Sequence, residues 1–306
     1  MYYKFIKTLY WLKNRRKGVK TVDSLAQVEG LLKECEALDQ TSPQRALEFA
    51  RSWFYMPDLG LTGQPNSQEY FDYQKRMYEA FSGKPWGTFD VVAQDDDICF
   101  NNLADLYPYA LKDYHVVSSH LKKIGYWIGC MDLKPNDKII EFGAGSAELA
   151  IFLAQTGHDI LATDISQTYV NLVKKKAEFL KLPLRAAKYD MSQSNSTEKY
   201  DVAIFCEAFH HSKNHIDLLE NLRNLLNTNG RAYLCGEPIT YYPYPWGVRT
   251  DGESIWMARK LGWLELGFDK HYFKTLAHSM GFDFKITANK SIDHAASVIC
   301  LQKKEP

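Results

Sequence analysis

Hydrophobic and polar positions change their pattern near residue 133. After LKPND (133–137), short apolar runs alternate with longer segments whose apolar residues recur at helical spacing. Apolar runs of this length predict strands, and the helical spacing predicts amphipathic helices. The predicted strands are KIIEFGAG, HDILATDIS, LPLRAAKYDMS, KYDVAIFCEA, RAYLCGEP, FDFKITAN and ASVICLQKK. Because strands and helices alternate, the sequence predicts an α/β fold with a doubly wound sheet that binds ligands at the carboxyl ends of its strands.

Three helices are predicted between these strands. Their sequences are SAELAIFLAQTG, QTYVNLVKKKAEFL and IDLLENLRNLLNTNG, and glycine closes the first and the last. Glycine is common just after the last residue of a helix, because it adopts the left-handed conformation easily. We therefore expect the last of these helices to continue until Gly230.

The chain before residue 125 has a mostly helical pattern. Ser42 and Pro43 have the pattern of a helix start, and the following ALEFARSWFYM predicts a helix that Pro57 stops. SQEYFDYQKRMYEAF predicts a second helix, and residues 107–130 predict one or two more. The sequence thus predicts a helical N-terminal cap at 1–125 and a core domain at 126–306.

The composition predicts a soluble globular protein without a net charge. The 306 residues include 37 Lys and Arg and 37 Asp and Glu, so no net field would gather a nucleic acid. The six cysteines are scattered without a CxxC pair, which favours a reducing compartment. We expect a cytoplasmic protein with no nucleic-acid partner and no membrane span.

Residues 1–20 are basic and aromatic, and they contain no acid. A helix of this composition can lie in the headgroup layer of an anionic membrane, which would place the protein peripherally at the inner membrane face. The alternative is a helix that packs on the protein's own body with a solvated basic face. The sequence leaves the oligomeric state open.

A glycine turn follows the first predicted strand in EFGAGSAEL (141–149). A dinucleotide-binding turn has the pattern GxGxxG, because the pyrophosphate lies on the helix N-terminus. Gly143 and Gly145 fit this pattern, but Glu148 occupies the third position, and its carboxylate would repel a pyrophosphate. The turn therefore favours a cofactor without phosphates. A nicotinamide oxidoreductase or epimerase remains an alternative that Glu148 argues against.

Two carboxylates follow at later strand ends. Asp164 closes the second strand, 23 residues after Glu141, where it can accept hydrogen bonds from ribose hydroxyls. Asp190 ends the third strand and is placed to accept a hydrogen bond from an adenine amine. An aspartate at a strand end is otherwise often only a helix cap.

Taken together, these segments resemble the class I S-adenosylmethionine-dependent methyltransferases over about residues 126–237. EFGAGSAELA is similar to the family's first motif, TDIS to its ribose-binding acid and KYDMS to the acid of its adenine pocket. The resemblance implies the Rossmann-like methyltransferase fold and S-adenosylmethionine as the cofactor. One departure is Ala147, where the family often has a glycine. The cofactor-binding residues that the resemblance implies are Glu141, Gly143, Gly145, Asp164, Ile165, Asp190, Met191 and Glu207.

The segment CEAFHHSKNH (206–215) lies at the end of the fourth strand, which in this fold faces the acceptor. A histidine near neutral pKa can remove the acceptor's proton during methyl transfer. We predict His211 or His210 as the base, oriented by Glu207 or Glu237. A metal site of Glu207, His211 and His215 is disfavoured, because no HExxH motif or second ligand cluster accompanies it. The alternative is that His210 packs its ring and caps the following helix.

Residues 238–268 form a predicted insertion rich in aromatic side chains and interspersed charges. Aromatic faces stack on sugar rings, and charged groups pair with the hydroxyls. The predicted acceptor-binding residues are Glu237, Tyr241, Tyr244, Trp246 and Arg249. We therefore expect O-methylation of a saccharide or glycan, as in polysaccharide biosynthesis, and no metal. The alternatives are a small-molecule acceptor such as a quinone, lipid or natural product, and a non-catalytic cofactor-binding module. Some of the insertion's aromatics could instead form the core of an extra helical layer.

Overall fold

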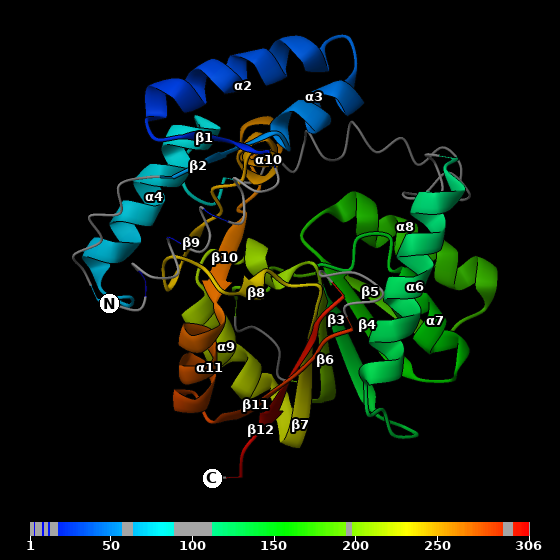
Figure 1. Ribbon diagram of the computed structural model, residues 1–306. Helices are drawn as coiled ribbons and strands as arrows, with labels where there is room; N and C mark the ends of the chain where they lie inside the picture. The colour runs from blue at the N-terminus through cyan, green and yellow to red at the C-terminus, as the bar shows by residue number, and fades with distance from the viewer. Residues whose placement is uncertain are drawn as a thin grey trace. The chain divides into compact units, whose positions relative to one another are not determined.

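The structure is a computed structural model in which the chain divides into two compact units (Figure 1). It describes residues 18–56, 64–88, 112–193, 198–289 and 296–305, together with positions 3, 8 and 12. The first unit combines Met1–Asp90 with Pro238–Phe273, and the second combines Val91–Glu237 with Lys274–Pro306. Both units are therefore built from two separate stretches of chain.

This division differs from the predicted boundary at residue 125 in two places. The predicted insertion at 238–268 lies within the first unit, although it follows the core strands in sequence. The helix α6 (Tyr114–Cys130), most of which was predicted as part of the cap, belongs to the second unit. Ile124 and Trp127 of α6 are buried in the core of that unit, which explains the assignment.

The second unit contains a seven-stranded sheet in the order β11-β12-β7-β6-β3-β4-β5. The strands β3 to β7 are parallel, whereas β12 runs antiparallel between β7 and β11. The strands are β3 (Lys138–Phe142), β4 (Asp159–Asp164), β5 (Leu184–Lys188), β6 (Tyr200–Cys206), β7 (Leu226–Cys235), β11 (Phe282–Thr287) and β12 (Val298–Lys303). The predicted α/β fold, with its mostly parallel sheet, is confirmed.

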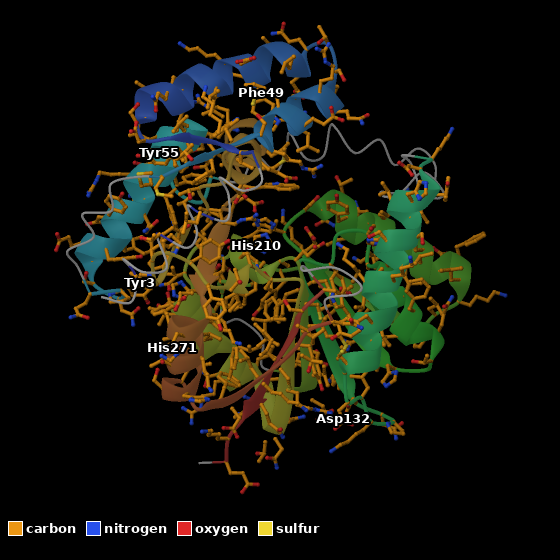
Figure 2. The ribbon with its side chains drawn as sticks, viewed as in Figure 1. Tyr3, Phe49, Tyr55, Asp132, His210 and His271 are labelled. Atoms are coloured by element: carbon orange, nitrogen blue, oxygen red, sulfur yellow. The ribbon has the colours of Figure 1, made fainter. Side chains whose placement is uncertain are left out.

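Helices cover both faces of this sheet (Figure 1). They are α7 (Glu148–Gln155), α8 (Gln167–Leu180), α9 (His215–Leu225) and α11 (Lys270–Ser279), with the short 3-10 turn η2 (Phe209–His211). On the face covered by α6, α7 and α8, a core forms around Ile139, Val202 and Ile204. His210 lies beyond the carboxyl ends of the parallel strands, and Asp132 lies at their amino ends; both residues are labelled in Figure 2.

The described part of the first unit contains four complete helices and two small sheets. The helices are α2 (Leu25–Asp39), α3 (Pro43–Ala50), α4 (Gln68–Ser82) and α10 (Gly252–Leu261). The strands β1 (Lys20–Val22) and β2 (Trp53–Tyr55) pair in parallel, and β8 (Ile239–Thr240), β10 (Leu266–Asp269) and β9 (Trp246–Val248) form the second sheet. The predicted helix 67–81 is present as α4, with Ser67 as its N-cap and Gly83 in the left-handed conformation after its end.

Two predicted helices end earlier than the pattern indicated. The helix that begins at Pro43 ends at Ala50, because the buried aromatic run Trp53–Tyr55 pairs with β1 instead of continuing the helix. The helix α9 ends at Leu225 rather than near Gly230, and β7 starts at once. Just past this end, the Leu226 carbonyl accepts a hydrogen bond from Nζ of Lys303 at 2.8 Å.

No helix in the described part of the chain has both the length and the apolar character needed to cross a bilayer. The predicted membrane-surface contact falls on residues 1–20, almost all of which lie outside the described residues. It therefore stays a prediction, as do the cytoplasmic location and the partners.

Candidate functional site

The turn between β3 and α7 is a bend with unusual backbone angles. Gly143, Gly145 and Ala147 have φ values of 61°, 51° and 59°. Glycine adopts this left-handed conformation at little cost in free energy, whereas for alanine it is unfavourable. A Cβ on Gly143 would lie 2.8 Å from the Cβ of Ala208, so this position also needs glycine for space. The bend brings the backbone close to the tip of β6, as a cofactor loop requires.

The neighbouring strand β4 holds this bend in place. The Ala144 amide donates to the Thr163 carbonyl at 2.9 Å, and the Gly145 amide donates to Oδ2 of Asp164 at 2.9 Å. Oδ1 of Asp164 accepts the Ser166 amide at 2.8 Å, at the start of α8. Asp164 thus fixes the bend and the next helix, besides lying where the resemblance implies ribose binding.

Glu141 lies near the carboxyl end of β3, a strand in the interior of the sheet, and is only 2% exposed. Burial raises the pKa of its carboxyl to about 8, and the nearby Glu148 carboxylate adds to the rise, while the Ala150 amide and the Cys206 thiol act against it. Its Oε2 atom has no hydrogen-bond partner among the described residues. A buried carboxyl oxygen without a partner is costly, so this position fits a ligand that brings a positive donor. The ammonium group of an amino-acid cofactor is such a donor.

The predicted adenine side lies after β5. Oδ1 of Asp190 accepts the Ser192 amide at 2.9 Å, which orders the loop. The methyl carbon of Met191 would lie 3.8 Å from a Cβ on Gly143, so this side chain reaches the glycine bend. Ile165 follows directly after β4 and is half-buried. The structure therefore gathers most of the predicted cofactor residues around one bend.

Glu207 departs from the other predicted cofactor residues. Its backbone is left-handed (φ 51°) and its side chain is 46% exposed. Oε1 of Glu207 lies 3.2 Å from Nζ of Lys123 on α6. Glu207 therefore pairs with a lysine rather than with a histidine. Lys123 was missed in the sequence because it precedes Glu207 by 84 residues and no motif marks it.

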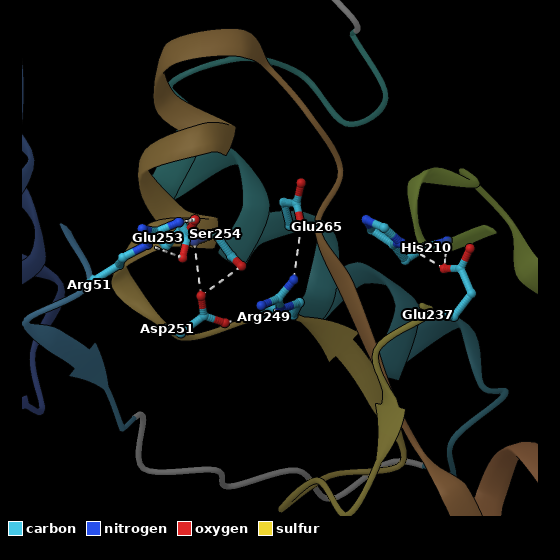
Figure 3. Close-up of polar contacts among 8 residues, drawn as sticks. All are labelled: Arg51, His210, Glu237, Arg249, Asp251, Glu253, Ser254 and Glu265. Atoms are coloured by element: carbon cyan, nitrogen blue, oxygen red, sulfur yellow. Dashed lines mark hydrogen bonds and ion pairs between the residues drawn. The ribbon is translucent and has the colours of Figure 1, made fainter. Parts of the chain in front are cut away.

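His210 and Glu237 form a buried pair within the second unit (Figure 3). Nδ1 of His210 lies 2.7 Å from Oε2 of Glu237, and the two side chains are 8% and 0% exposed. The carboxylate also accepts the backbone amides of Ala208 and Phe209 at 2.8 Å and of His210 at 3.1 Å. The predicted pairing of His210 with Glu237 is thus present in the structure.

The environment of Glu237 decides the proton positions in this pair. Burial raises the pKa of Glu237 to about 7, while the amides of Phe209 and Ala208 lower it. The three backbone amides that donate to this carboxylate favour its ionised form. In that form it only accepts hydrogen bonds, so Nδ1 of His210 carries the hydrogen that lies between them. The neutral ring then presents its lone pair on Nε2. This is the tautomer that a general base needs.

His211 and His215 have different surroundings. The rings of His210 and His211 lie 4.0 Å apart, so the 3-10 turn keeps them together, whereas a helix would have made them diverge. His215 is 2% exposed, and burial lowers its pKa to about 3, which keeps it neutral. Within the described residues, Glu207, His211 and His215 do not gather into one ligand group.

The predicted acceptor residues of the insertion lie mostly inside the first unit. Trp246 is 2% exposed and its Nε1 donates to the Pro65 carbonyl at 2.7 Å, and the Tyr244 hydroxyl donates to the Val248 carbonyl at 3.0 Å. Both side chains therefore belong to the core of the first unit. Arg249 pairs with Asp251 and Glu265 (Figure 3).

Tyr241 is the exception, because it is 58% exposed. Nζ of Lys270 lies 6.0 Å from the centre of its ring. Of the three predicted aromatic acceptor residues, Tyr241 is thus the one whose ring is open to a ligand.

Comparison with known proteins adds a family match. Residues 140–232 match the profile of a family described as "Methyltransferase domain". This stretch runs from β3 into β7 and contains the glycine bend, Asp164, Asp190 and the His210 turn. The match favours a methyltransferase over the nicotinamide alternative.

Two curated relatives are fungal. The chain is 28% identical over 135 residues to "Highly reducing polyketide synthase PKS2" of Leptosphaeria maculans, which covers 39% of this chain and 5% of the relative. It is 29% identical over 116 residues to "Highly reducing polyketide synthase pspA" of Penicillium soppii, which covers 33% of this chain and 4% of the relative. The matched stretches are therefore small parts of much longer proteins.

Among solved structures, the chain is similar to one from the Haloferax volcanii complex between the Trm112 methyltransferase activator and a methyltransferase. The TM-score is 0.52 at 12% sequence identity, covering 71% of this chain and 99% of that chain. At this identity the similarity supports the fold alone.

Proposed function

Because the chain contains a class I S-adenosylmethionine-dependent methyltransferase domain, we propose that it methylates an acidic carbon of a polyketide-like small molecule, with His210 as the base. The observation that carries this proposal is the 2.7 Å contact between Nδ1 of His210 and Oε2 of Glu237 at the ends of β6 and β7. The acceptor class comes from the two polyketide synthases that the chain resembles.

The cofactor, S-adenosylmethionine, supplies an electrophilic methyl group on a sulfonium. Glu141 would hold its ammonium group, because Oε2 is buried without a partner within the described residues. The bend at Gly143 and Gly145 would carry the methionine part, and Asp164 and Asp190 the ribose and the adenine. These assignments follow the resemblance, and the geometry of the bend supports them.

The remaining chemistry belongs to the protein's own side chains. A polyketide chain carries carbonyl groups on alternate carbons, and a carbon between two carbonyls is a weak acid. Nε2 of His210 would take its proton, and the electron pair of the broken C–H bond would form the bond to the methyl carbon. The methyl–sulfur bond would break at the same time, and its electron pair would stay on the sulfur, which leaves as a neutral thioether. Glu237 stabilises the imidazolium that results, because an opposite charge at hydrogen-bond distance favours the charged form.

A saccharide hydroxyl is the second candidate acceptor. The exposed ring of Tyr241, with Lys270 beside it, is the observation that favours it. The burial of Trp246 and Tyr244 removes most of the stacking surface on which this reading depended.

The proposal is tested by supplying methyl-labelled S-adenosylmethionine with a β-ketoacyl thioester and, separately, with a panel of saccharides. We expect label on the carbon between the two carbonyls, located by mass spectrometry and NMR. Label on a sugar hydroxyl alone would replace the first candidate by the second. Label found only in protein or nucleic acid from a cell extract would contradict both.

A further inference from the structure

Lys176 is a buried cation that the cofactor motifs do not include. It lies on α8 and is 7% exposed. Burial lowers the pKa of its ammonium, and the Glu148 carboxylate acts against this. Lysine is rarely buried unless it is paired, so its position calls for a reason.

The partner of Lys176 is the glycine bend. Nζ of Lys176 donates to the carbonyl oxygen of Ser146 at 2.7 Å. The Ser146 hydroxyl donates to Oε1 of Glu148 at 2.5 Å, on the first turn of α7. The buried ammonium thus lies against the bend, with a carboxylate near enough to offset part of its charge.

The peptide that Lys176 holds comes immediately before the strained residue of the bend. Ala147 has φ 59° and is 0% exposed. It is also the N-cap of α7, yet its side chain cannot cap the helix. A non-glycine residue in this conformation persists only where its surroundings impose it. On the other side of the bend, β4 does this through its hydrogen bonds with Ala144 and Gly145, and on the side of Ala147 the contact comes from Lys176 of α8.

We infer that Lys176 is a positioning residue for cofactor binding: its contact with the Ser146 carbonyl holds the bend in the conformation that Ala147 alone would disfavour. The inference rests on the cofactor part of the proposed function and not on the acceptor. It has a specific consequence, because a glycine at 147 would adopt the same conformation without strain. The need for Lys176 and the presence of Ala147 should therefore be coupled.

The test is a double-mutant cycle of Lys176→Met and Ala147→Gly, with S-adenosylhomocysteine affinity measured by calorimetry and melting temperature by circular dichroism. Lys176→Met should weaken binding roughly tenfold, the size expected for a lost charged hydrogen bond, with little change in melting temperature. In the Ala147→Gly background the same substitution should cost less than about threefold, because the two sites are coupled. The matched control is Lys175→Met, an exposed neighbour on the same helix, which should bind like the wild type.

Binding by the wild-type protein distinguishes a wrong cofactor assignment from a wrong role for Lys176. A wild-type protein that does not bind S-adenosylhomocysteine contradicts the cofactor assignment itself. Normal wild-type binding with an unchanged affinity in Lys176→Met overturns the positioning role alone. An equal loss in both backgrounds also overturns it, because the bend would then not be what Lys176 controls. If Lys176→Met does not fold, a double variant that folds and binds S-adenosylhomocysteine supports the inference, because the glycine at 147 then removes the need for Lys176. A double variant that also fails to fold, while Ala147→Gly folds, overturns it.

Discussion

Nδ1 of His210 lies 2.7 Å from Oε2 of Glu237, and the same carboxylate accepts the amide of His210 at 3.1 Å. The glutamate therefore holds both the ring and the backbone of one residue. Because Glu237 follows β7 and His210 follows β6, the pairing of these two strands sets the position of the histidine. The fold therefore determines both the tautomer and the orientation of the His210 ring.

Replacing His210 by glutamine should lower turnover by about 10²–10⁴-fold, the usual contribution of a general base. Glutamine can still donate to Glu237, so the turn should keep its shape, but it cannot take up a proton. Affinity for S-adenosylmethionine should stay within about twofold, because the change removes the base and leaves the glycine bend untouched. Steady-state kinetics and calorimetry measure the two effects separately.

His211→Gln is the matched control, because its ring lies 4.0 Å from that of His210. It should keep most of the activity. The reverse pattern, with His211→Gln inactive and His210→Gln active, would assign the base to His211. Loss of cofactor affinity in His210→Gln would instead place this residue in the cofactor pocket.

Much of the second unit could be predicted because its elements are local. The helix from Gln167 to Leu180 begins after the N-cap Ser166, and its bounds match the predicted segment. The contacts that define the first unit are not local: Arg51 binds Glu253 across 202 residues. No periodicity in a single stretch reports such a contact, so the predicted boundary at residue 125 missed it.

In the site, too, the local features could be predicted from the sequence and the long-range contacts could not. The glycine bend and its acids are marked by spacing, and the structure brings them together. Lys123 and Lys176 carry no such mark, because a lysine on an amphipathic helix looks like part of its solvated face. The sequence also could not choose between Glu207 and Glu237 as the partner of a histidine, because that choice depends on which strand lies beside β6.

Cofactor affinity should depend on pH through Glu141. Burial raises the pKa of this carboxyl to about 8, so below that pH the ligand-free protein holds it protonated. A bound ammonium favours the ionised form, so binding releases a proton and the affinity should rise from pH 6 to 8, by up to about tenfold per unit. Above about pH 8 the rise should stop, because the α-amino group of the cofactor loses its own proton. Calorimetry in two buffers of different ionisation enthalpy measures the released proton.

Glu141→Gln checks this linkage in the opposite direction. The folded-state pKa of about 8 lies above the ordinary 4.5, so the folded protein binds more protons and its stability falls as the pH rises through that window. Glutamine does not titrate, so the variant should gain stability relative to wild type at pH 8. It should bind the cofactor more weakly and without the pH dependence. A wild-type affinity that stays constant from pH 6 to 8 would contradict the assignment of Glu141.

Gly143→Ala should impair both stability and catalysis. Its φ of 61° is costly for alanine, and the new Cβ would lie 2.8 Å from the Cβ of Ala208. Together these should cost about 2–4 kcal/mol in urea unfolding. Since the Ala208 amide binds Glu237, a shift of Ala208 should also move the His210 pair and lower kcat. Gly125→Ala on α6 is the control: nothing lies within 4 Å of its Cβ, and it should stabilise by about 0.5–1 kcal/mol. A neutral Gly143→Ala would show that the bend can relax.

Trp246 and Tyr241 should separate the core of the first unit from its acceptor surface. Trp246 is 2% exposed, so Trp246→Ala should cost about 3–5 kcal/mol of unfolding free energy. Tyr241 is 58% exposed, so Tyr241→Ala should change stability by less than about 0.5 kcal/mol. If Tyr241 contacts the acceptor, its variant should raise the acceptor KM while kcat and the cofactor affinity hold, because the lost contact stabilises ground and transition states alike. An unchanged KM in Tyr241→Ala would show that this exposed ring does not contact the acceptor. The saccharide candidate would then lose its structural support, and the natural-product acceptor would be favoured.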